Sequence, residues 1–488
     1  MKSIIKRIVI FGLSLVFSAV GYISYYTYKN KAESGANLTS YVEKVFNQDR
    51  TQVVAENVKI DVYSRQSGDK YNSPVFAVGD LINKSIDYKK LHPEEDVSIN
   101  FAIYRMEIDT ACYYKKGSRN YGKMTSLDTE YTDDCERVTY SMVKAAKNGI
   151  NVKFIYHRDV TKHTAALKDY MDTFSDEPCF FDETKKVSDF LEVKHVKWDI
   201  DNAGIEQMHN KQLLVSDYLD FDGTEHHNAV WASTGNVDIH RSTTQTPRKD
   251  KDWANTGITI SNHELVYNCN LKYFDIVFRN DVNRDGFTKE VLEQHENGFY
   301  LDGGLNYVDD AFECYFTPFP QTNSTLYDVM YNPYAKYIER MNECQDTISL
   351  HLNMYHMGVI TNDSASRLIL TRICDAFENN TNEDNFFAYK QYKGITTDFE
   401  NSAMFNRMKQ IGKCETNVMT HKKDALFYFG DTDEYICITG SLNAHHGEMF
   451  GKSNNCIVIK ERGENHPVYD RLVKAFYETT KDAGLLVV

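Results

Sequence analysis

The ten cysteines of this 488-residue chain include no Cys-x-x-Cys pair, so the ligand spacing of a zinc ribbon is absent. The chain also has no net positive charge, because its 70 acidic and 55 basic residues give a formal net charge of -15. This balance argues against broad, nonspecific binding to nucleic acid but is compatible with a local basic cleft. The composition is not that of a disordered chain, since 42% of the residues are hydrophobic and 13% aromatic. A chain of this length can form two domains or one large duplicated domain.

An uncharged run at the N-terminus predicts a membrane segment. Basic residues within positions 1–7 precede the run over 8–28, which at about 21 residues is long enough to cross a bilayer as a helix. A cleaved signal peptide and a retained signal anchor both fit, and the tyrosines that end the run favour the anchor. We therefore expect a cytoplasmic tail over 1–7, a transmembrane signal anchor over 8–28 and a stalk over 29–72. The charge order predicts a single-pass type II protein whose main part is lumenal, in the endoplasmic reticulum or endolysosome, or extracellular.

This topology bears on the cysteines and on glycosylation. An oxidising compartment permits disulfides, whose pairing cannot be read from the sequence. Cys437 and Cys456 lie in apolar runs and are expected to be buried thiols. A glycoprotein is compatible with the Asn-x-Ser/Thr sequons at Asn37, Asn83, Asn323, Asn362 and Asn379.

Two similar segments carry a recurring polar set. Each opens with a His-x-Lys triplet, continues as an apolar strand, turns, and returns along a strand that closes with a hydroxyl and an amide. The members are His209, Lys211, Thr234 and Asn236 in the first copy, and His421, Lys423, Ser441 and Asn443 in the second.

The two copies predict one site for a phosphodiester. Alternation along a strand points the His and Lys of each triplet to the same side. Ammonium and amide groups hold the oxygens of phosphorus, one neutral imidazole attacks, and a protonated imidazole serves the leaving oxygen. This chemistry requires no metal and no other cofactor. The paired histidines at 226–227 and 445–446 are expected to be exposed turn residues rather than metal ligands.

Helix and strand patterns also recur in both halves of the chain. Residues 75–88 and 97–104 predict a helix and a strand, and 333–341 and 347–352 repeat that order, with Asn332 as the helix N-cap. The two histidines lie 212 residues apart (421 minus 209). The pattern predicts a duplicated α/β fold with its first half over 73–285, a linker over 286–325 and its second half over 326–488.

The paired motifs resemble the H-x-K-x4-D and G-S-x-N signature of the phospholipase D superfamily. The resemblance implies two α/β halves packed face to face around a pseudo-twofold active site. It further implies a covalent phosphohistidine on His209, with His421 protonating the leaving group. Chemistry alone does not choose between the two histidines. Lys211, Lys423, Asn236 and Asn443 would hold phosphate oxygens, assisted by Thr234 and Ser441.

The chain departs from that signature in three ways, of which the first is that both hairpin turns are longer than the usual family spacing. Ser216 and Tyr428 stand where the motif has Asp. Asn255 and Asn454 stand where the family has a supporting Glu that orients an imidazole, and an amide does not stabilise an imidazolium as a carboxylate does. Slower chemistry is therefore expected, and an inactive homologue that binds anions or a membrane is the alternative.

We accordingly expect a metal-independent phosphodiesterase of the hydrolase class. Two substrate classes stay open. A bilayer anchor and an acidic surface favour a phospholipid, whereas the lumenal type II layout resembles an endolysosomal exonuclease branch acting on single-stranded nucleic acid. The oligomeric state cannot be read from the sequence.

Overall fold

A computed structural model describes residues 57–64, 73–106, 134–159, 166–198, 207–237, 254–320, 331–357, 364–392, 402–416 and 418–479. Among these residues no helix is long and apolar enough to cross a membrane. The predicted tail, the anchor over 8–28 and most of the predicted stalk lie outside the described residues.

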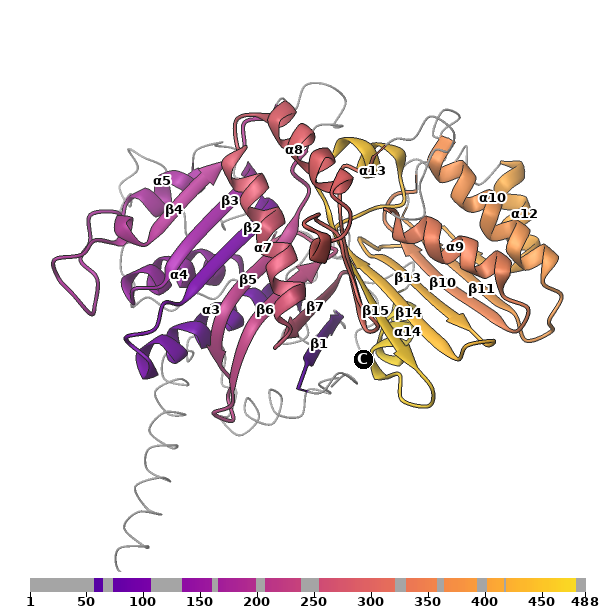
Figure 1. The fold of residues 1–488 in the computed structure, drawn as a ribbon, viewed down its shortest axis with the longest axis horizontal. Coiled ribbons are helices and arrows are strands. Elements are labelled where there is room, and N and C mark those ends of the chain that lie inside the picture. The colour runs from indigo at the N-terminus through magenta and orange to yellow at the C-terminus, as the bar shows by residue number, and fades with distance from the viewer. Residues whose placement is uncertain are drawn as a thin grey trace, which may run out of the picture.

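Two sheets, side by side in Figure 1, form the two halves. The order of the first sheet is β1 (Lys59–Ser64), β7 (Thr256–Ser261), β6 (Glu225–Ser233), β5 (Lys211–Leu219), β2 (Ser98–Met106), β3 (Asn151–Asp159) and β4 (Leu191–His195). The order of the second is β12 (Lys413–Glu415), β11 (Phe386–Gln391), β10 (Ile348–Met354), β13 (Lys423–Phe429), β14 (Glu434–Gly440), β15 (Asn455–Arg462), β9 (Phe312–Phe316) and β8 (Tyr307–Val308).

The second sheet repeats the first in both order and direction. In each sheet three strands run parallel, β2 with β3 and β4, and β10 with β11 and β12. The hairpins β5–β6 and β13–β14 then add antiparallel to β2 and β10, followed by β7 and β15. The predicted duplication of a mixed α/β unit therefore describes the architecture.

The edge strands β1 and β9 place the limits of the repeat differently from the sequence prediction. Strand β1 pairs with β7 of the first sheet, although the sequence assigned its residues to a stalk over 29–72. Strand β9 pairs with β15, and β8 with β9, although both lie in the predicted linker over 286–325. Each of these two strands is only five or six residues long and is held by pairing with a distant strand.

Helices cover both sheets, and several begin as the sequence predicts. Asn332 accepts hydrogen bonds from Tyr334 N (3.1 Å) and Ala335 N (3.4 Å) at the start of α9. The helices are α3 (Pro74–Leu91), α4 (Asp134–Lys147), α5 (Ala166–Asp172), α7 (Glu264–Arg279), α8 (Arg284–Glu296), α9 (Pro333–Glu343), α10 (Ser364–Asn379), α12 (Ala403–Ile411), α13 (His446–Gly451) and α14 (Pro467–Glu478), with short 3-10 turns at Val187–Asp189 and Tyr300–Asp302.

The two halves share a hydrophobic core. One cluster joins the first sheet to α3 and α4, and another joins the second sheet to α9, α10 and α12. A third cluster contains residues of α7, α14 and both sheets. Leu213 belongs to the first cluster and Leu214 to the third, so β5 is buried on both faces. Both faces of this strand must therefore be apolar, which explains its continuous hydrophobic run.

The described cysteines correct one expectation. All eight of them, at positions 179, 269, 314, 344, 374, 414, 437 and 456, are free thiols. Burial raises the pKa of the Cys437 and Cys456 thiols well above the usual value, in keeping with the prediction that these two are core residues. A disulfide as predicted would have to involve Cys112 and Cys135, whose side chains lie outside the described residues.

Candidate active site

The two His-x-Lys segments meet at the junction of the halves, because each pairs with the other half just before its hairpin. His209 N donates to Ser453 O (2.7 Å), and His421 N donates to Ala254 O (2.8 Å). Short bridges join Met208 to Ser453 and Ala254 to Thr420. The pseudo-twofold relation therefore extends to the main chain that positions the two histidines.

The imidazole of His209 is held by the second half. Its Nδ1 lies 2.8 Å from Asn454 Oδ1 and 3.1 Å from Glu448 Oε2. Because both neighbours are acceptors, Nδ1 carries the ring proton, and the lone pair of the neutral ring is on Nε2. The side chain is buried, with 6% of its surface exposed.

Glu448 is the site residue that the sequence analysis missed. It lies in α13, is buried, and forms an ion pair with Lys452 across one turn (Oε1 to Nζ 2.6 Å). It follows Asn443 by five residues (448 minus 443), ahead of the position where the family's supporting Glu is expected and Asn454 stands. Because Glu448 does not stand at the spacing where the signature has its Glu, the sequence alone did not identify it as a site residue.

Protonation differs between these partners. Burial lowers the pKa of His209 to about 4, aided by Lys211 and opposed by Glu448. Burial alone would raise the pKa of Glu448, but His209 and Lys452 hold that pKa well below its usual range. At neutral pH the pair is therefore a neutral imidazole beside a carboxylate.

His421 has a related but uncharged partner. Its Nδ1 lies 3.1 Å from Asn255 Oδ1 in the first half. Lys423 Nζ lies 3.4 Å from the same nitrogen. An amide oxygen thus lies beside Nδ1 of both histidines, so both Asn residues that stand where the resembled signature has Glu lie beside an imidazole. His209 Nδ1 therefore lies 3.1 Å from a carboxylate oxygen, whereas His421 Nδ1 lies beside an amide oxygen and an ammonium.

Both motif lysines are buried and bound to main chain. Lys211 Nζ donates to His209 O (2.8 Å), and Lys423 Nζ donates to His421 O (2.8 Å). A tyrosine ring lies next to each ammonium, Tyr104 near Lys211 (5.4 Å) and Tyr355 near Lys423 (5.2 Å). The same rings lie 5.0 and 4.4 Å from His209 and His421. These two tyrosines lie outside the sequence motifs, although both occupy equivalent places at the ends of β2 and β10.

Thr234 and Ser441 support the amides behind the histidines. Ser441 Oγ donates to Asn454 Oδ1 (3.1 Å), and Thr234 Oγ1 lies 3.5 Å from Asn255 Oδ1. Each hydroxyl also accepts a main-chain N–H, from Asn455 (3.0 Å) and Thr256 (2.9 Å). These contacts place both hydroxyls behind the amides that contact the histidines, and their predicted assistance in phosphate binding stays a prediction.

Asn236 and Asn443 close the hairpins as predicted and are both buried. Asn443 Oδ1 accepts from His356 N (3.2 Å). The His356 ring stacks on His445 at 4.5 Å. The predicted His, Lys and Asn residues are thus buried at the ends of the hairpin strands, where the halves join.

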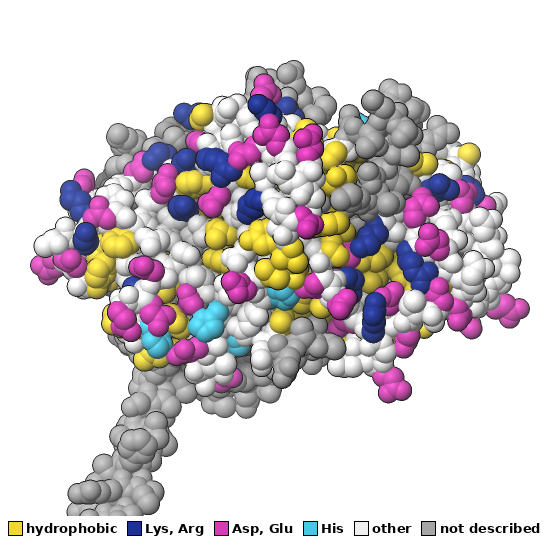
Figure 2. Space-filling view, viewed as in Figure 1, with side chains coloured by type: hydrophobic (Ala, Val, Ile, Leu, Met, Phe, Trp, Pro, Cys, Tyr) yellow, Lys and Arg dark blue, Asp and Glu magenta, His cyan; other side chains and the backbone are white. Residues whose placement is uncertain are grey.

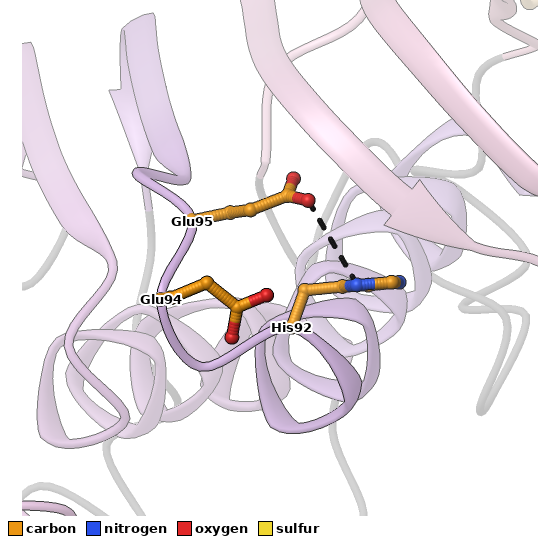
Figure 3. Close-up of side chains that lie close together, drawn as sticks. All are labelled: His92, Glu94 and Glu95. Atoms are coloured by element: carbon orange, nitrogen blue, oxygen red, sulfur yellow. Dashed lines mark ion pairs between the residues drawn. The ribbon is translucent and has the colours of Figure 1, made fainter.

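The one group of three or more potential metal ligands found in the described part of the chain lies elsewhere. It comprises His92, Glu94 and Glu95, just after α3 (Figure 3). His92 Nε2 already contacts Glu225 Oε1 (2.8 Å), at the tip of the β5–β6 hairpin. Histidine and acidic side chains are visible together over the first half in Figure 2. Since β5 begins at Lys211 and this tip is its far end, the cluster is separate from the histidine site.

No protein-family model matches the sequence, and no curated protein matches it either. Among solved structures, the chain is similar to polyphosphate kinase from Porphyromonas gingivalis (12% identity, TM-score 0.45), covering 86% of this chain and half of that one. It is similar to phosphatidylserine synthase from Haemophilus influenzae Rd KW20 (11%, TM-score 0.46), covering 93% and 94%. A shorter match is Nuc from Salmonella typhimurium (11%, TM-score 0.23), covering 35% and 93% and described as a phospholipase D family member. At these identities and TM-scores the matches carry no conclusion about this chain, so its chemistry has to come from its own site residues.

Proposed function

We propose that this chain is a phosphodiesterase that works through a covalent phosphohistidine and needs no metal ion. The observation that carries the proposal is the pair of buried imidazoles, each held through Nδ1 by an amide from the opposite half, at 2.8 and 3.1 Å. A lysine ammonium lies beside each ring. Nucleophile, proton donor and positive charge are thereby supplied by the chain itself.

The reaction has two steps, formation of the phosphohistidine and its resolution by water or an alcohol. His209 Nε2 attacks phosphorus, so a P–N bond forms while the bond from phosphorus to the leaving oxygen breaks, and His421 Nε2–H gives its proton to that oxygen. Water or an alcohol then attacks phosphorus, the P–N bond breaks, and His421 takes the proton of the attacking group. Lys211, Lys423, Asn236 and Asn443 would balance the charge on the phosphate oxygens.

A chromogenic diester provides the direct test. Bis(4-nitrophenyl) phosphate should give nitrophenolate and, on a quench without acid, a trapped phosphoenzyme. His209→Ala should abolish both, and the surface variant His92→Ala should retain both. Turnover that survives His209→Ala would contradict the proposal. Tungstate binding without a phosphoenzyme in the unmodified chain would instead identify the inactive, anion-binding alternative.

The substrate is proposed as single-stranded nucleic acid, with phospholipid as the second candidate. Tyr355 and Tyr392 stack on each other at 5.3 Å beside His421 and are both partly exposed, as a platform for a base requires. Phospholipid is favoured by the anchor predicted at 8–28, which would hold the site at a lumenal or extracellular membrane face. Release of nucleotides from a 5′-hydroxyl oligonucleotide, compared with release of headgroup from labelled vesicles, decides between them.

A further inference from the structure

A buried hydroxyl in helix α7 lies behind the segment that carries His209. Tyr273 Oη donates to Thr317 O (2.8 Å) and lies 2.8 Å from Ser453 Oγ. Ser453 Oγ also contacts Oδ1 of Asn210, the residue that follows His209. The side chains of Tyr273, Ser453 and Asn210 are fully buried. One phenol therefore joins α7 to two segments next to strands β9 and β15 of the second sheet, and through Ser453 it reaches the histidine segment.

Thr317 and Ser453 are residues that hold His209 in place. His209 N donates to Ser453 O (2.7 Å), which fixes the main chain of the histidine. Thr317 Oγ1 accepts from Asn454 N (2.8 Å) and lies 3.2 Å from Asn454 Nδ2. These contacts turn Oδ1 of the Asn454 amide toward His209 Nδ1, 2.8 Å away. Both the main chain and the ring of His209 thus depend on residues that Tyr273 contacts.

We propose that Tyr273 is a positioning residue for His209. It acts through Ser453 and Thr317, and it lies outside the repeated motifs. The inference rests on the proposed function and adds a residue from α7 to the site. Phe316 stacks on the Tyr273 ring, with 4.5 Å between the centroids, which limits rotation of the phenol. Burial raises the pKa of the Tyr273 phenol well above its usual range, so the hydroxyl stays protonated wherever a histidine titrates.

The physical reason is the narrow geometry that attack on phosphorus requires. His209 Nε2 has to lie about 3–3.5 Å from phosphorus and in line with the leaving oxygen. Loss of the Tyr273 hydroxyl leaves Thr317 O and Ser453 Oγ with one partner fewer in a buried place, so the two segments can shift. A displacement of about 1 Å at a reacting atom can slow a reaction about 100-fold.

The test measures phosphoenzyme formation from bis(4-nitrophenyl) phosphate in single turnovers of the full chain. Tyr273→Phe removes only the hydroxyl and should slow this step about 10–100-fold, as loss of an outer partner of a functional histidine does. The diester concentration for half-maximal rate should change little, because Lys211 and Lys423 keep their main-chain acceptors. Unfolded molecules would lower the amplitude of the nitrophenolate burst, whereas a misplaced His209 lowers its rate constant.

Tyr218→Phe is the matched control. Tyr218 is also buried, and its hydroxyl lies 2.9 Å from Ser261 Oγ, so the same kind of hydroxyl pair is lost. Tyr218 pairs with His226 near the tip of the β5–β6 hairpin, at the end remote from Lys211. This variant should lose stability but form phosphoenzyme at the rate of the unmodified chain.

Ser453→Ala tests the same contacts without changing the aromatic packing. The main-chain bond from His209 to position 453 remains, and phosphoenzyme formation should again slow about 10–100-fold. Because both substitutions break the contact between Tyr273 and Ser453, the double variant should be little slower than the slower single variant.

Three results would overturn the inference: an unmodified rate constant in folded Tyr273→Phe, equal slowing in Tyr218→Phe, or effects of Tyr273→Phe and Ser453→Ala that multiply in the double variant. Absence of phosphoenzyme in the unmodified chain is a separate result. It would refute the proposed function itself, and the role of Tyr273 with it.

Discussion

The ammonium of Lys423 donates a 2.9 Å hydrogen bond to the main-chain carbonyl of Thr234, which belongs to the other half of the molecule. Its second carbonyl acceptor is His421 O, at 2.8 Å. Lys423 therefore ties the hairpin of one half to the histidine strand of the other, and its fully buried position makes any loss of these bonds costly.

Lys423→Met should abolish diester turnover and lower the free energy of unfolding. The substitution leaves two buried carbonyls without this donor, at about 1–3 kcal/mol for each unsatisfied group, and removes a positive charge from the proposed phosphate site. Denaturant unfolding and diester turnover measure the two effects.

The neighbouring Lys422 offers a matched control for that change. It is equally buried, and its ammonium donates to Ala475 O (3.0 Å) in α14, away from His421. Lys422→Met leaves one buried carbonyl without its donor, so it should lose about half as much stability as Lys423→Met but keep turnover at a temperature where it is folded. Equal loss of turnover in both variants would argue that Lys423 matters only for folding.

Gly235→Ala should disturb His421 through Asn255. A Cβ at position 235 would lie 2.4 Å from Asn255 Oδ1, the atom that accepts from His421 Nδ1, so the amide must move. We expect turnover to fall about 10–100-fold, as when the outer partner of a functional imidazole is lost.

Gly223 lies at the far end of the same hairpin, and a Cβ there meets nothing within 4 Å. Its φ of +84° means that Gly223→Ala costs stability, about 1 kcal/mol, without reaching the site. Diester turnover in both variants is the measurement. Normal turnover in Gly235→Ala would show that Asn255 has room to shift without affecting His421.

The residues that recur in both halves are the ones that could be predicted from the sequence. His209, Lys211 and Asn236 recur as His421, Lys423 and Asn443, and repetition alone was enough to predict that both sets belong to one site. Asn255 and Asn454 were found by their offset from the motifs, and both lie beside an imidazole. The duplicated fold followed from helix and strand periodicity.

What did not repeat could not be predicted. Glu448 lies outside the repeated motif residues, and its contact with His209 joins residues 239 positions apart (448 minus 209). Strand β1 is six residues long and is fixed by its partner β7, so local sequence gives little signal for it. Predictions that depend on pairing between distant segments need the structure.

Buried histidines should make the fold less stable in acid. Burial lowers the pKa of His295 to about 4, and its Nε2 contacts Phe316 O (2.9 Å). Between pH 6.5 and 4 the unfolded chain binds a proton at this residue that the folded chain does not, so stability rises with pH across that window. The change amounts to about 3 kcal/mol for this histidine.

His295→Gln isolates this contribution, since the amide donates to the same carbonyl but does not titrate. Denaturant unfolding at pH 7 and pH 4.5 should show a smaller pH dependence in the variant. Glu461 acts in the opposite direction, because burial raises its pKa to about 7, and it is unchanged between the two proteins. An identical pH dependence in both would contradict the assignment to His295.

Thiol counting in the denatured, unreduced chain should find ten reactive cysteines, or eight if Cys112 and Cys135 form a disulfide. The eight described cysteines are free, and seven of them are buried. In the native protein these buried thiols should react slowly, because burial both shields them and disfavours the thiolate, as the raised pKa of Cys374, about 11, illustrates. Fewer than eight thiols on denaturation would mean that described cysteines pair, and a reductant would then change the unfolding temperature.

Tyr392→Leu should distinguish the two proposed substrate classes. Tyr392 stacks on Tyr355, whose ring lies 4.4 Å from that of His421, so a base stacked there would sit beside the proposed proton donor. Loss of one stacking partner is worth about 1–3 kcal/mol, which lowers kcat/KM on a single-stranded oligonucleotide about 5–150-fold. Headgroup release from vesicles should not change, since an acyl lipid offers no base to stack.

Tyr435 provides the matched control for the stacking test. It is also partly exposed and packs on another tyrosine, Tyr428, at 4.7 Å, but at the end of the β13–β14 hairpin remote from His421. Tyr435→Leu should leave oligonucleotide turnover unchanged. If Tyr392→Leu behaves like Tyr435→Leu while the oligonucleotide is cleaved, the bases bind elsewhere. If only the vesicles are cleaved, by both variants alike, the tyrosine pair is a structural contact and phospholipid is the substrate class.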